Sequence, residues 1–160
     1  MSNSDEFGGV ADVVGGGLPE SVVTAGSTAL MMIDLQYVDA HRDFGIGAAG
    51  QKNGWTTDME YYFSRLETET IPNVQRILAA CRAGGIPAIH VRVMNLSGDS
   101  EDTSWRYKMM GIFVPPDSKD AEFIEEVAPI PGEVVLSKTT SKPSCPRTPT
   151  SCSATWASTR

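Results

Sequence analysis

The chain is predicted to be an α/β protein, a three-layer α/β/α domain whose doubly wound, mainly parallel sheet is incomplete. Short apolar runs at residues 28–34, 86–93 and 133–138 alternate with helical patterns, which is typical of a parallel sheet. Beyond Lys138 the sequence contains no Val, Ile, Leu, Met or Phe, so the pattern of strands and helices does not continue. We therefore expect about three strands of such a sheet.

Composition and charge indicate an ordinary globular domain and limit its partners. The 160 residues are 41% hydrophobic and 21% charged. The net charge is −7, and residues 1–138 carry 20 acidic against 10 basic side chains, which argues against nucleic acid or an anionic membrane as a partner. No apolar run reaches the ~18 residues of a membrane-spanning helix, and the N-terminus lacks the pattern of a secretory signal. We expect a cytoplasmic protein.

The two ends of the chain differ from the part between them. Residues 1–27 are rich in Gly, Ser, Val and acidic side chains without a sustained period, and we interpret them as a flexible leader. Residues 28–141 form the predicted domain. Residues 142–160 are mostly Ser, Thr and Pro and are predicted to be a disordered or non-native tail.

The first strand is predicted at Thr28–Asp34, a run that is apolar on both faces and ends in a carboxylate. Such a run suits a parallel strand covered by helices on each side. A short aromatic segment, Asp58–Leu66, is a helix candidate.

The clearest helix is predicted at Thr70–Arg82. Pro72 falls in its first turn, where the missing N–H has no partner to lose, and Gly84-Gly85 supplies the stop. Its apolar side chains recur at helical spacing on one face: Val74, Ile77, Leu78 and Cys81. A second strand at Ile86–Val93 completes a βαβ crossover, which is normally right-handed.

The third strand is predicted at Glu133–Lys138, after a long irregular stretch at Met94–Pro116. A loop of this length is often a lid or a binding loop, but its aromatic side chains could equally form a strap that covers the sheet. A helix is predicted at Asp120–Val127, with Ser118 as a possible cap.

Two charged side chains lie where ligands collect in open parallel sheets, beyond the carboxyl ends of the strands. Asp34 ends the first predicted strand and Lys138 ends the third. Brought together, a carboxylate and an ammonium could tune each other's ionisation and serve a nucleophile. The alternative is an ordinary surface pair at the ends of two strands.

A dinucleotide-binding domain fits poorly, because its glycine-rich turn directly follows the first strand. Here Asp34-Leu35-Gln36-Tyr37 follows, and the glycines at 45 and 47 come too late. The sequence shows no metal-ligand spacing and no cofactor motif, and its three cysteines form no disulfide framework. Of its two histidines, one is embedded in a strand, where a packed or hydrogen-bonded role is expected.

Three segments resemble the isochorismatase-like cysteine hydrolases: TALMMIDLQ at residues 28–36, IPNVQRILAACRAGGIPAIHVR at residues 71–92 and VVLSKT at residues 134–139. The resemblance covers residues 28–141. It implies a small amide-like or related substrate and an Asp–Lys–Cys triad, in which Asp34 takes the proton of the cysteine and Lys138 balances charge and helps to position the substrate. Gln36 lies beside them, with a scaffolding role as open as a catalytic one.

The nucleophilic cysteine of this family follows a fourth strand, some tens of residues beyond the lysine, and no counterpart is present here. Cys145 and Cys152 lie in the tail without the strand and helix start that lower the pKa of a thiol. Cys81 belongs to the apolar face of a helix and is expected in the core. The resemblance therefore implies a hydrolase whose activity in this chain is doubtful.

The tail has a possible origin in a shifted reading frame. Suppose that the nucleotides encoding residues from Pro143 onward are translated from the third base of each codon. They then permit a segment with helix-capping residues, an apolar Leu-Leu-x-x-Leu face and a final Gly. We hypothesise a frameshift near residues 141–142; a genuine disordered tail is the alternative.

Two functions follow from these observations. One is a hydrolase by ancestry, acting on a small molecule and inactive in this chain. The other is a non-catalytic fragment or interaction module. Without later strands, the first strand presents an apolar edge, and we expect self-association through it.

Overall fold

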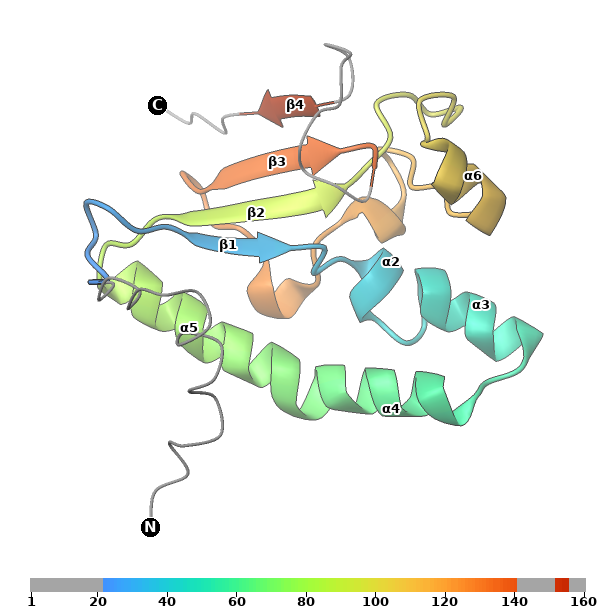
Figure 1. The fold of residues 1–160 in the computed structure, drawn as a ribbon, viewed down its shortest axis with the longest axis horizontal. Coiled ribbons are helices and arrows are strands. Elements are labelled where there is room, and N and C mark those ends of the chain that lie inside the picture. Colours follow the sequence, from blue (N-terminus) through green and yellow to red (C-terminus); the bar gives the residue numbers. More distant parts are fainter. Residues whose placement is uncertain (1–21, 141–151, 156–160) are drawn as a thin grey trace, which may run out of the picture.

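The computed structural model describes residues 22–140 and the backbone of residues 152–155. One sheet has the strand order β1-β2-β3-β4, and its first three strands are parallel while the last is antiparallel to β3 (Figure 1). These strands are β1 (Leu30–Ile33), β2 (Ala88–Val93), β3 (Val134–Lys138) and β4 (Cys152–Thr155). Three parallel strands in one open sheet with helices confirm the predicted incomplete α/β fold.

The core lies between the sheet and a long helical rod. Met32 of β1 and Ala88 of β2 pack with Leu78 of the rod, and all three are less than a tenth exposed. Around them lie further buried apolar side chains: Phe63, Leu66, Ile71, Ile124 and Val127. Because successive residues of a strand point to opposite faces, Met31 and Ile33 turn away from this core and are about half exposed, at 49% and 47%.

The rod joins two helices that the sequence predicts as separate. It consists of α4 (Thr57–Arg65), the π-helical turn η1 (Leu66–Thr70) and α5 (Ile71–Ala83) without a break (Figure 1). Pro72 has no N–H and its ring crowds the carbonyl four residues earlier, and the wider π turn directly precedes it, with the Ile71 N–H bonded to the Leu66 carbonyl. The proline thus marks a widened turn within one rod.

The predicted apolar face of α5 is only partly buried. Leu78 is 2% exposed and Val74 packs against the core, whereas Ile77 is 52% exposed. The prediction that Cys81 lies in the core is wrong, because this side chain is only partly buried. The core cluster includes Ile71, Val74 and Leu78 of α5 but neither Ile77 nor Cys81.

Three short helices had no counterpart in the sequence-based prediction. They are α2 (Tyr37–Ala40), α3 (Gly45–Asn53) and α6 (Trp105–Met110). Helix α6 lies within the stretch predicted as irregular; the Ser104 hydroxyl accepts a hydrogen bond from the Tyr107 N–H at its start, and Gly111 ends it with a φ of +67°. Trp105 is 76% exposed, so this aromatic side chain does not cover the sheet as a strap would.

The helix predicted at Asp120–Val127 is wrong. Two single 3-10 turns form instead, η2 (Lys119–Ala121) and η3 (Glu125–Val127). Backbone groups between them bond to the segment after β1: the Tyr37 N–H donates to the Glu122 carbonyl, and the Ile124 N–H donates to the Leu35 carbonyl. These long-range bonds hold the segment extended, and a helix would break them.

The predictions for the two ends are only partly covered by the described residues. Most of the predicted leader, residues 1–21, lies outside them, as do residues 141–151 and 156–160 of the predicted tail. Within the tail, the backbone of Cys152–Thr155 forms β4. Among the described helices, none is long and apolar enough to cross a membrane.

A partly buried ionic cluster ties α5 to the sheet at the edge where the parallel strands begin. Arg82 donates two hydrogen bonds of 2.8 Å to the Glu133 carboxylate, and Glu133 also lies 2.8 Å from His90 Nε2. His90 is 1% exposed, which confirms the hydrogen-bonded role expected for the histidine in the second strand. These bonds, that of Arg82 above all, lower the pKa of Glu133 from its ordinary 4.5 to about 2.

We expect Glu133→Gln to lower the free energy of unfolding at pH 7 by on the order of 2 kcal/mol, since Arg82 is 30% exposed and solvent weakens the pair. Because the folded-state pKa is the lower one, this contribution is present above pH ~4.5 and is lost as the pH falls toward 2. Urea unfolding at pH 7, 5, 4 and 3 measures it. A constant difference between variant and parent would contradict the assignment, and exposed Glu126→Gln is the control.

Candidate active site

The backbone is strained at the first site residue. Asp34 directly follows β1 and has a φ of +60°, a conformation that costs energy for any residue except glycine. Its N–H donates to the Val91 carbonyl of β2, which fixes the turn. Strain of this kind persists where the surrounding structure over-determines it, and it is concentrated at functional sites.

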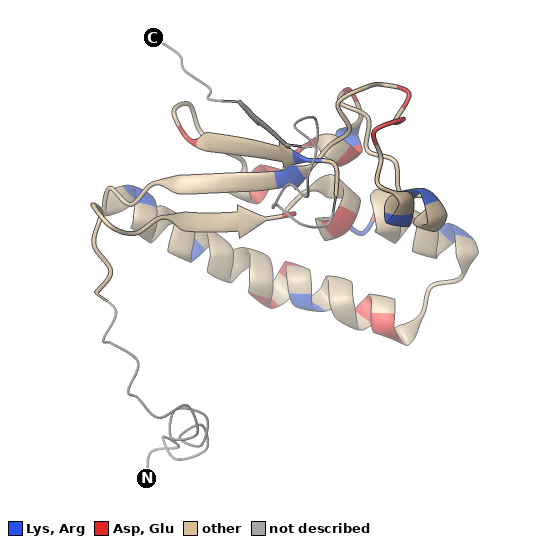
Figure 2. Cartoon of the chain, turned by 45° about the horizontal axis from the view of Figure 1, so that its top comes forward, with Lys and Arg blue, Asp and Glu red and all other residues tan. Residues whose placement is uncertain are grey.

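Asp34 and Lys138 form the ion pair at the carboxyl ends of the strands. Lys138 Nζ lies 2.8 Å from Asp34 Oδ2; the lysine side chain is 2% exposed and that of the aspartate 28%. Figure 2 shows basic and acidic segments meeting at these strand ends. The burial of Lys138 makes the pair unlike an exposed surface pair.

One oxygen of this pair has no partner among the described residues. Asp34 Oδ1 is buried and accepts no hydrogen bond from them. An unpaired buried acceptor costs about 1–3 kcal/mol. Asp34 therefore holds Lys138 through one oxygen and leaves the other without a partner among the described residues.

Gln36 is fully buried, and its side-chain amide forms hydrogen bonds with backbone groups. Its Nε2 donates to the carbonyls of Val93, at 2.8 Å, and Ala121, at 3.2 Å, while its Oε1 accepts from the Val93 N–H at 2.6 Å. The side chain thus joins the segment after β1 to the end of β2. This geometry favours the scaffolding role over the catalytic one.

A second carboxylate near the pair was not singled out from the sequence. Asp39 of α2 is partly buried, and burial, followed by the charge of Asp34, raises its pKa to about 6, while the charge of Lys138 opposes the shift. Its position five residues after Asp34 gave no periodic or motif signal. Only the turn into α2 brings it back toward the strand ends.

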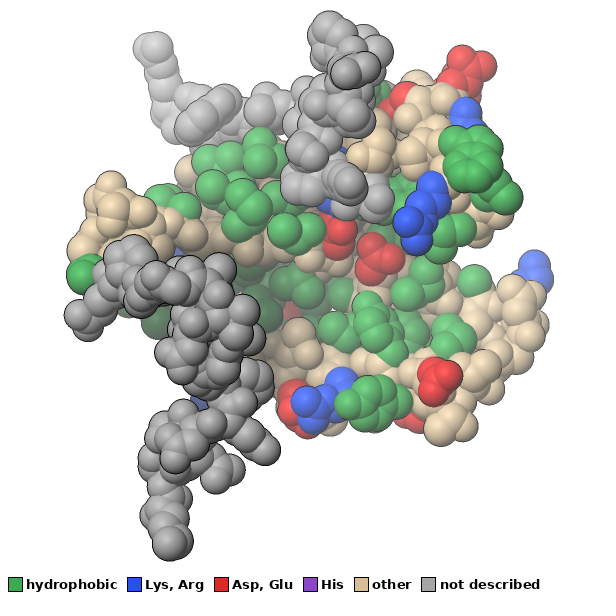
Figure 3. Space-filling model, in the orientation of Figure 1, with side chains coloured by type: hydrophobic (Ala, Val, Ile, Leu, Met, Phe, Trp, Pro, Cys, Tyr) green, Lys and Arg blue, Asp and Glu red, His purple; other side chains and the backbone are tan. Residues whose placement is uncertain are grey.

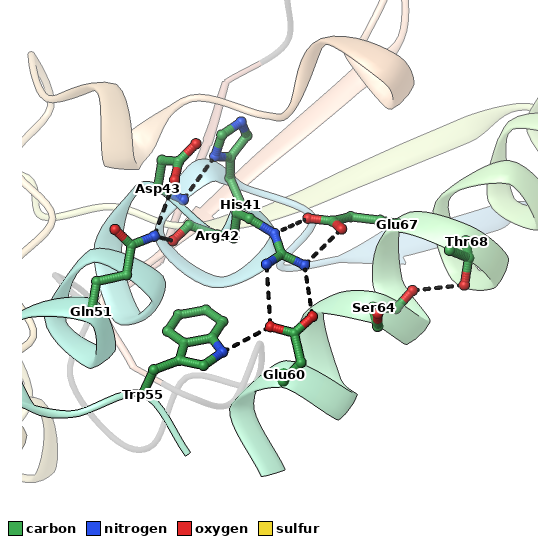
Figure 4. Close-up of polar contacts among 9 residues, drawn as sticks. All are labelled: His41, Arg42, Asp43, Gln51, Trp55, Glu60, Ser64, Glu67 and Thr68. Carbon is green, nitrogen blue, oxygen red and sulfur yellow. Dashed lines mark hydrogen bonds and ion pairs between the residues drawn. The ribbon is translucent and has the colours of Figure 1, made fainter. Parts of the chain in front are cut away.

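Arg42 lies in the loop after α2 and binds this loop to the helical rod, as Figure 4 shows. Arg42 donates to Glu67 at 2.6 and 2.9 Å and makes weaker contacts to Glu60. Trp55 Nε1 donates to Glu60 at 2.8 Å, and hydrogen bonds from Trp55 and Arg42 lower the pKa of Glu60. The network ties the loop after α2 to α4 and η1, and so helps to fix α2.

The three cysteines differ in where they lie relative to the Asp34–Lys138 pair. The Cys81 carbonyl accepts from the Ile86 N–H just before β2, so Cys81 lies at the edge where the strands begin, opposite Asp34. The backbone of Cys152 is the register partner of Lys138 in the antiparallel pair, which the sequence did not foresee. Cys145 lies outside the described residues. In residues 22–140, no group of three or more metal-ligating His, Cys, Asp or Glu side chains is found.

Fold and site together define an α/β protein of the open parallel-sheet class with a buried Asp–Lys pair beyond its strand ends. The family model "Isochorismatase domain" matches residues 28–144. An N-carbamoylsarcosine amidase from Arthrobacter sp is 38% identical over 92 residues, which is 54% of this chain and 34% of the amidase. The chain thus spans about a third of the length of that relative.

A solved structure shares the fold. It is a cysteine hydrolase from Pseudomonas syringae pv. phaseolicola 1448A, matched with a TM-score of 0.55 and 21% identity over 78% of this chain and 52% of that one. This chain belongs to the isochorismatase family of hydrolases. The resemblance to this family is thereby confirmed.

Proposed function

We propose that the Asp34–Lys138 pair is the proton-handling part of a cysteine hydrolase site that acts on a small amide-like or related molecule. The observation that carries this proposal is the ion pair of 2.8 Å, in which Asp34 Oδ1 has no partner among the described residues. A carboxylate held in this way can take the proton of a thiol, and the resulting thiolate attacks a carbonyl carbon. The amidase relative supports an amide bond as the target.

Roles for the three residues follow from their contacts. Asp34 is the base, and Lys138 holds its carboxylate and balances the charge that develops on the substrate. Gln36 positions Asp34 by fixing the turn after β1 against β2. The proposed location of the protein is the cytoplasm.

In this 160-residue chain we propose negligible turnover. In the sequence, Cys145 and Cys152 lie among Ser, Thr and Pro, a composition that does not predict the helix start that would lower the pKa of a thiol. A change of reading frame near residues 141–142 is the proposed origin of the tail. The nucleotide sequence around those codons tests it, and an uninterrupted coding region that preserves this tail in close relatives would rule it out.

Binding of a small amide tests the proposed site without requiring turnover. We expect acetamide, titrated into the ¹⁵N-labelled chain, to shift the backbone resonances of Asp34 and Lys138, because its carbonyl and N–H groups complement the pair. These shifts should vanish in Lys138→Met. Shifts confined to residues away from the strand ends would contradict the proposal.

A second candidate function, self-association, is supported by the free edge of β1. In the described part of the chain β1 pairs only with β2, which leaves the backbone groups of its other edge open to another strand. Beside this edge lies an apolar groove of about 230 Å³, lined by residues of β1 and α5 that include Met31, Ile33 and Ile77. Figure 3 shows hydrophobic side chains gathered over the strands. The proposed occupant is β1 of a second copy.

We expect the purified chain to form dimers or larger species in light scattering coupled to size exclusion, and Ile33→Lys to shift it toward monomer. A lysine at the edge opposes strand pairing because a second copy would bring like charges together. Ile130→Lys is the matched control, since Ile130 is 48% exposed but lies away from β1. A parent protein that elutes as a monomer at all concentrations would contradict the proposal.

A further inference from the structure

A cavity of about 220 Å³ opens beside the Asp34–Lys138 pair. At ~30 Å³ for each water-sized group, it has room for roughly seven. Its walls come from α2, α3, the end of β2, and α6 with the segment after it, and all but one of the lining side chains are apolar or aromatic: Val38, Asp39, Ile46, Val93, Tyr107, Met110, Ile112 and Val114. Val93 is the register partner of Lys138, so the cavity adjoins the site.

Asp39 is the single carboxylate in this wall. In the described part of the chain, no hydrogen bond or ion pair to its carboxylate is found; the contacts of Asp39 run through its backbone, whose carbonyl accepts from the Tyr62 hydroxyl. A carboxylate in an apolar wall is costly to keep charged unless a donor meets it. The raised pKa of Asp39, caused first by burial, reflects that cost.

The charges around the cavity favour a cation. Asp34 and Asp120 both act on Asp39 and raise its pKa, while Lys138 is the cation that acts against them. The ammonium of Lys138 is already held by Asp34 at 2.8 Å. Asp39 and Asp120 then outnumber Arg106, which acts on Tyr107 of the cavity wall, and an excess of negative charge in a low-dielectric cavity attracts positive ligands.

We propose that this cavity binds the part of the substrate that does not react, and that this part is a small organic ammonium group on a short hydrocarbon chain, held by Asp39. The inference rests on the proposed function and names its substrate class: a small amide that also carries an amine. The hydrocarbon packs on Val93, Met110 and Val114, the ammonium bonds to Asp39, and the amide reaches the Asp34–Lys138 pair. Asp39 thus selects the substrate.

Calorimetric titration of the full chain with n-butylammonium, butyramide and butyrate tests this. At pH 7 we expect n-butylammonium to bind at least about tenfold more tightly than butyramide, the scale of one charge-assisted hydrogen bond, and butyrate not to bind. Asp39→Asn should remove the preference for the cation. Asp43→Asn, an exposed aspartate on the following loop, should keep it.

The pH dependence of binding gives a second readout that needs no variant. Affinity for n-butylammonium should rise between pH 5 and pH 7 as Asp39 ionises around its pKa of about 6. Other titratable or charged groups at the cavity or acting on its polar members are Asp34, Tyr62, Arg106, Tyr107, Asp120 and Lys138. A flat profile, or a cation preference that survives in Asp39→Asn, would overturn the inference. Neither result bears on the acetamide test of the catalytic pair, so the two proposals can fail separately.

Discussion

Replacement of Asp34 by asparagine is expected to lower the free energy of unfolding by about 3 kcal/mol. Lys138 is 2% exposed and its ammonium relies on Asp34 Oδ2 at 2.8 Å. Removal of one partner of a buried ion pair leaves an uncompensated charge, which costs about 3–5 kcal/mol. The lower end applies because the Asp34 side chain is 28% exposed and water can partly replace it. Urea unfolding at pH 7 measures the change.

Two companion variants separate this effect from a general loss of a carboxylate. Asp117→Asn changes an exposed aspartate and should stay within about 0.5 kcal/mol of the parent. The double variant Asp34→Asn with Lys138→Met also removes the unpaired lysine charge. It should therefore be more stable than the sum of the two single changes predicts. An Asp34→Asn protein as stable as its parent would show that the pair is not buried in solution.

Replacement of Gln36 by leucine is expected to lower the free energy of unfolding by about 2–3 kcal/mol. The side chain is 0% exposed and supplies the acceptor for the Val93 N–H and donors for two carbonyls. Leucine fits the volume but leaves a buried backbone N–H without a partner, at a cost of about 1–3 kcal/mol, and disturbs the carbonyls as well.

We expect Gln36→Leu to displace Asp34 as well as to lower stability, since Gln36 fixes the turn that contains Asp34. We expect the backbone resonances of residues 34 and 93 to shift in Gln36→Leu and the acetamide response to weaken. Gln51→Leu is the matched control, because Gln51 is exposed and bonds only to the neighbouring loop. Unchanged stability in Gln36→Leu would contradict the scaffolding role.

The strands could be predicted from the sequence because their apolar runs are short and alternate with helical patterns. The three predicted strands differ from β1, β2 and β3 by no more than two residues at either end. The helix at 120–127 could not be excluded, since its apolar spacing suits a helix as well as the 3-10 turns that form. Hydrogen bonds from Tyr37 and Ile124 to distant partners decide between them, and no local pattern encodes those bonds.

The candidate site was predicted in part. The parallel order of β1 and β3 on either side of β2 brings Asp34 and Lys138 to one edge. Their positions at strand ends indicated this edge, while their pairing as a site came from the family resemblance. The role of Gln36 could not be settled from the sequence, because its partners are backbone groups of Val93 and Ala121. Asp39 could not be predicted as a site residue, because the cavity that it lines is closed by α6, a helix within a stretch predicted as irregular.

The measurement that tests the account most directly is release of ammonia from a panel of small amides by the purified 160-residue chain, with and without iodoacetamide. The panel includes amides that carry an amine. Our account predicts no release above the blank, since the sequence around the tail cysteines does not predict the helix start that would lower the pKa of a thiol. Release that iodoacetamide blocks, and that is lost in both Asp34→Asn and Cys152→Ser, would contradict it and identify Cys152, the register partner of Lys138, as the nucleophile.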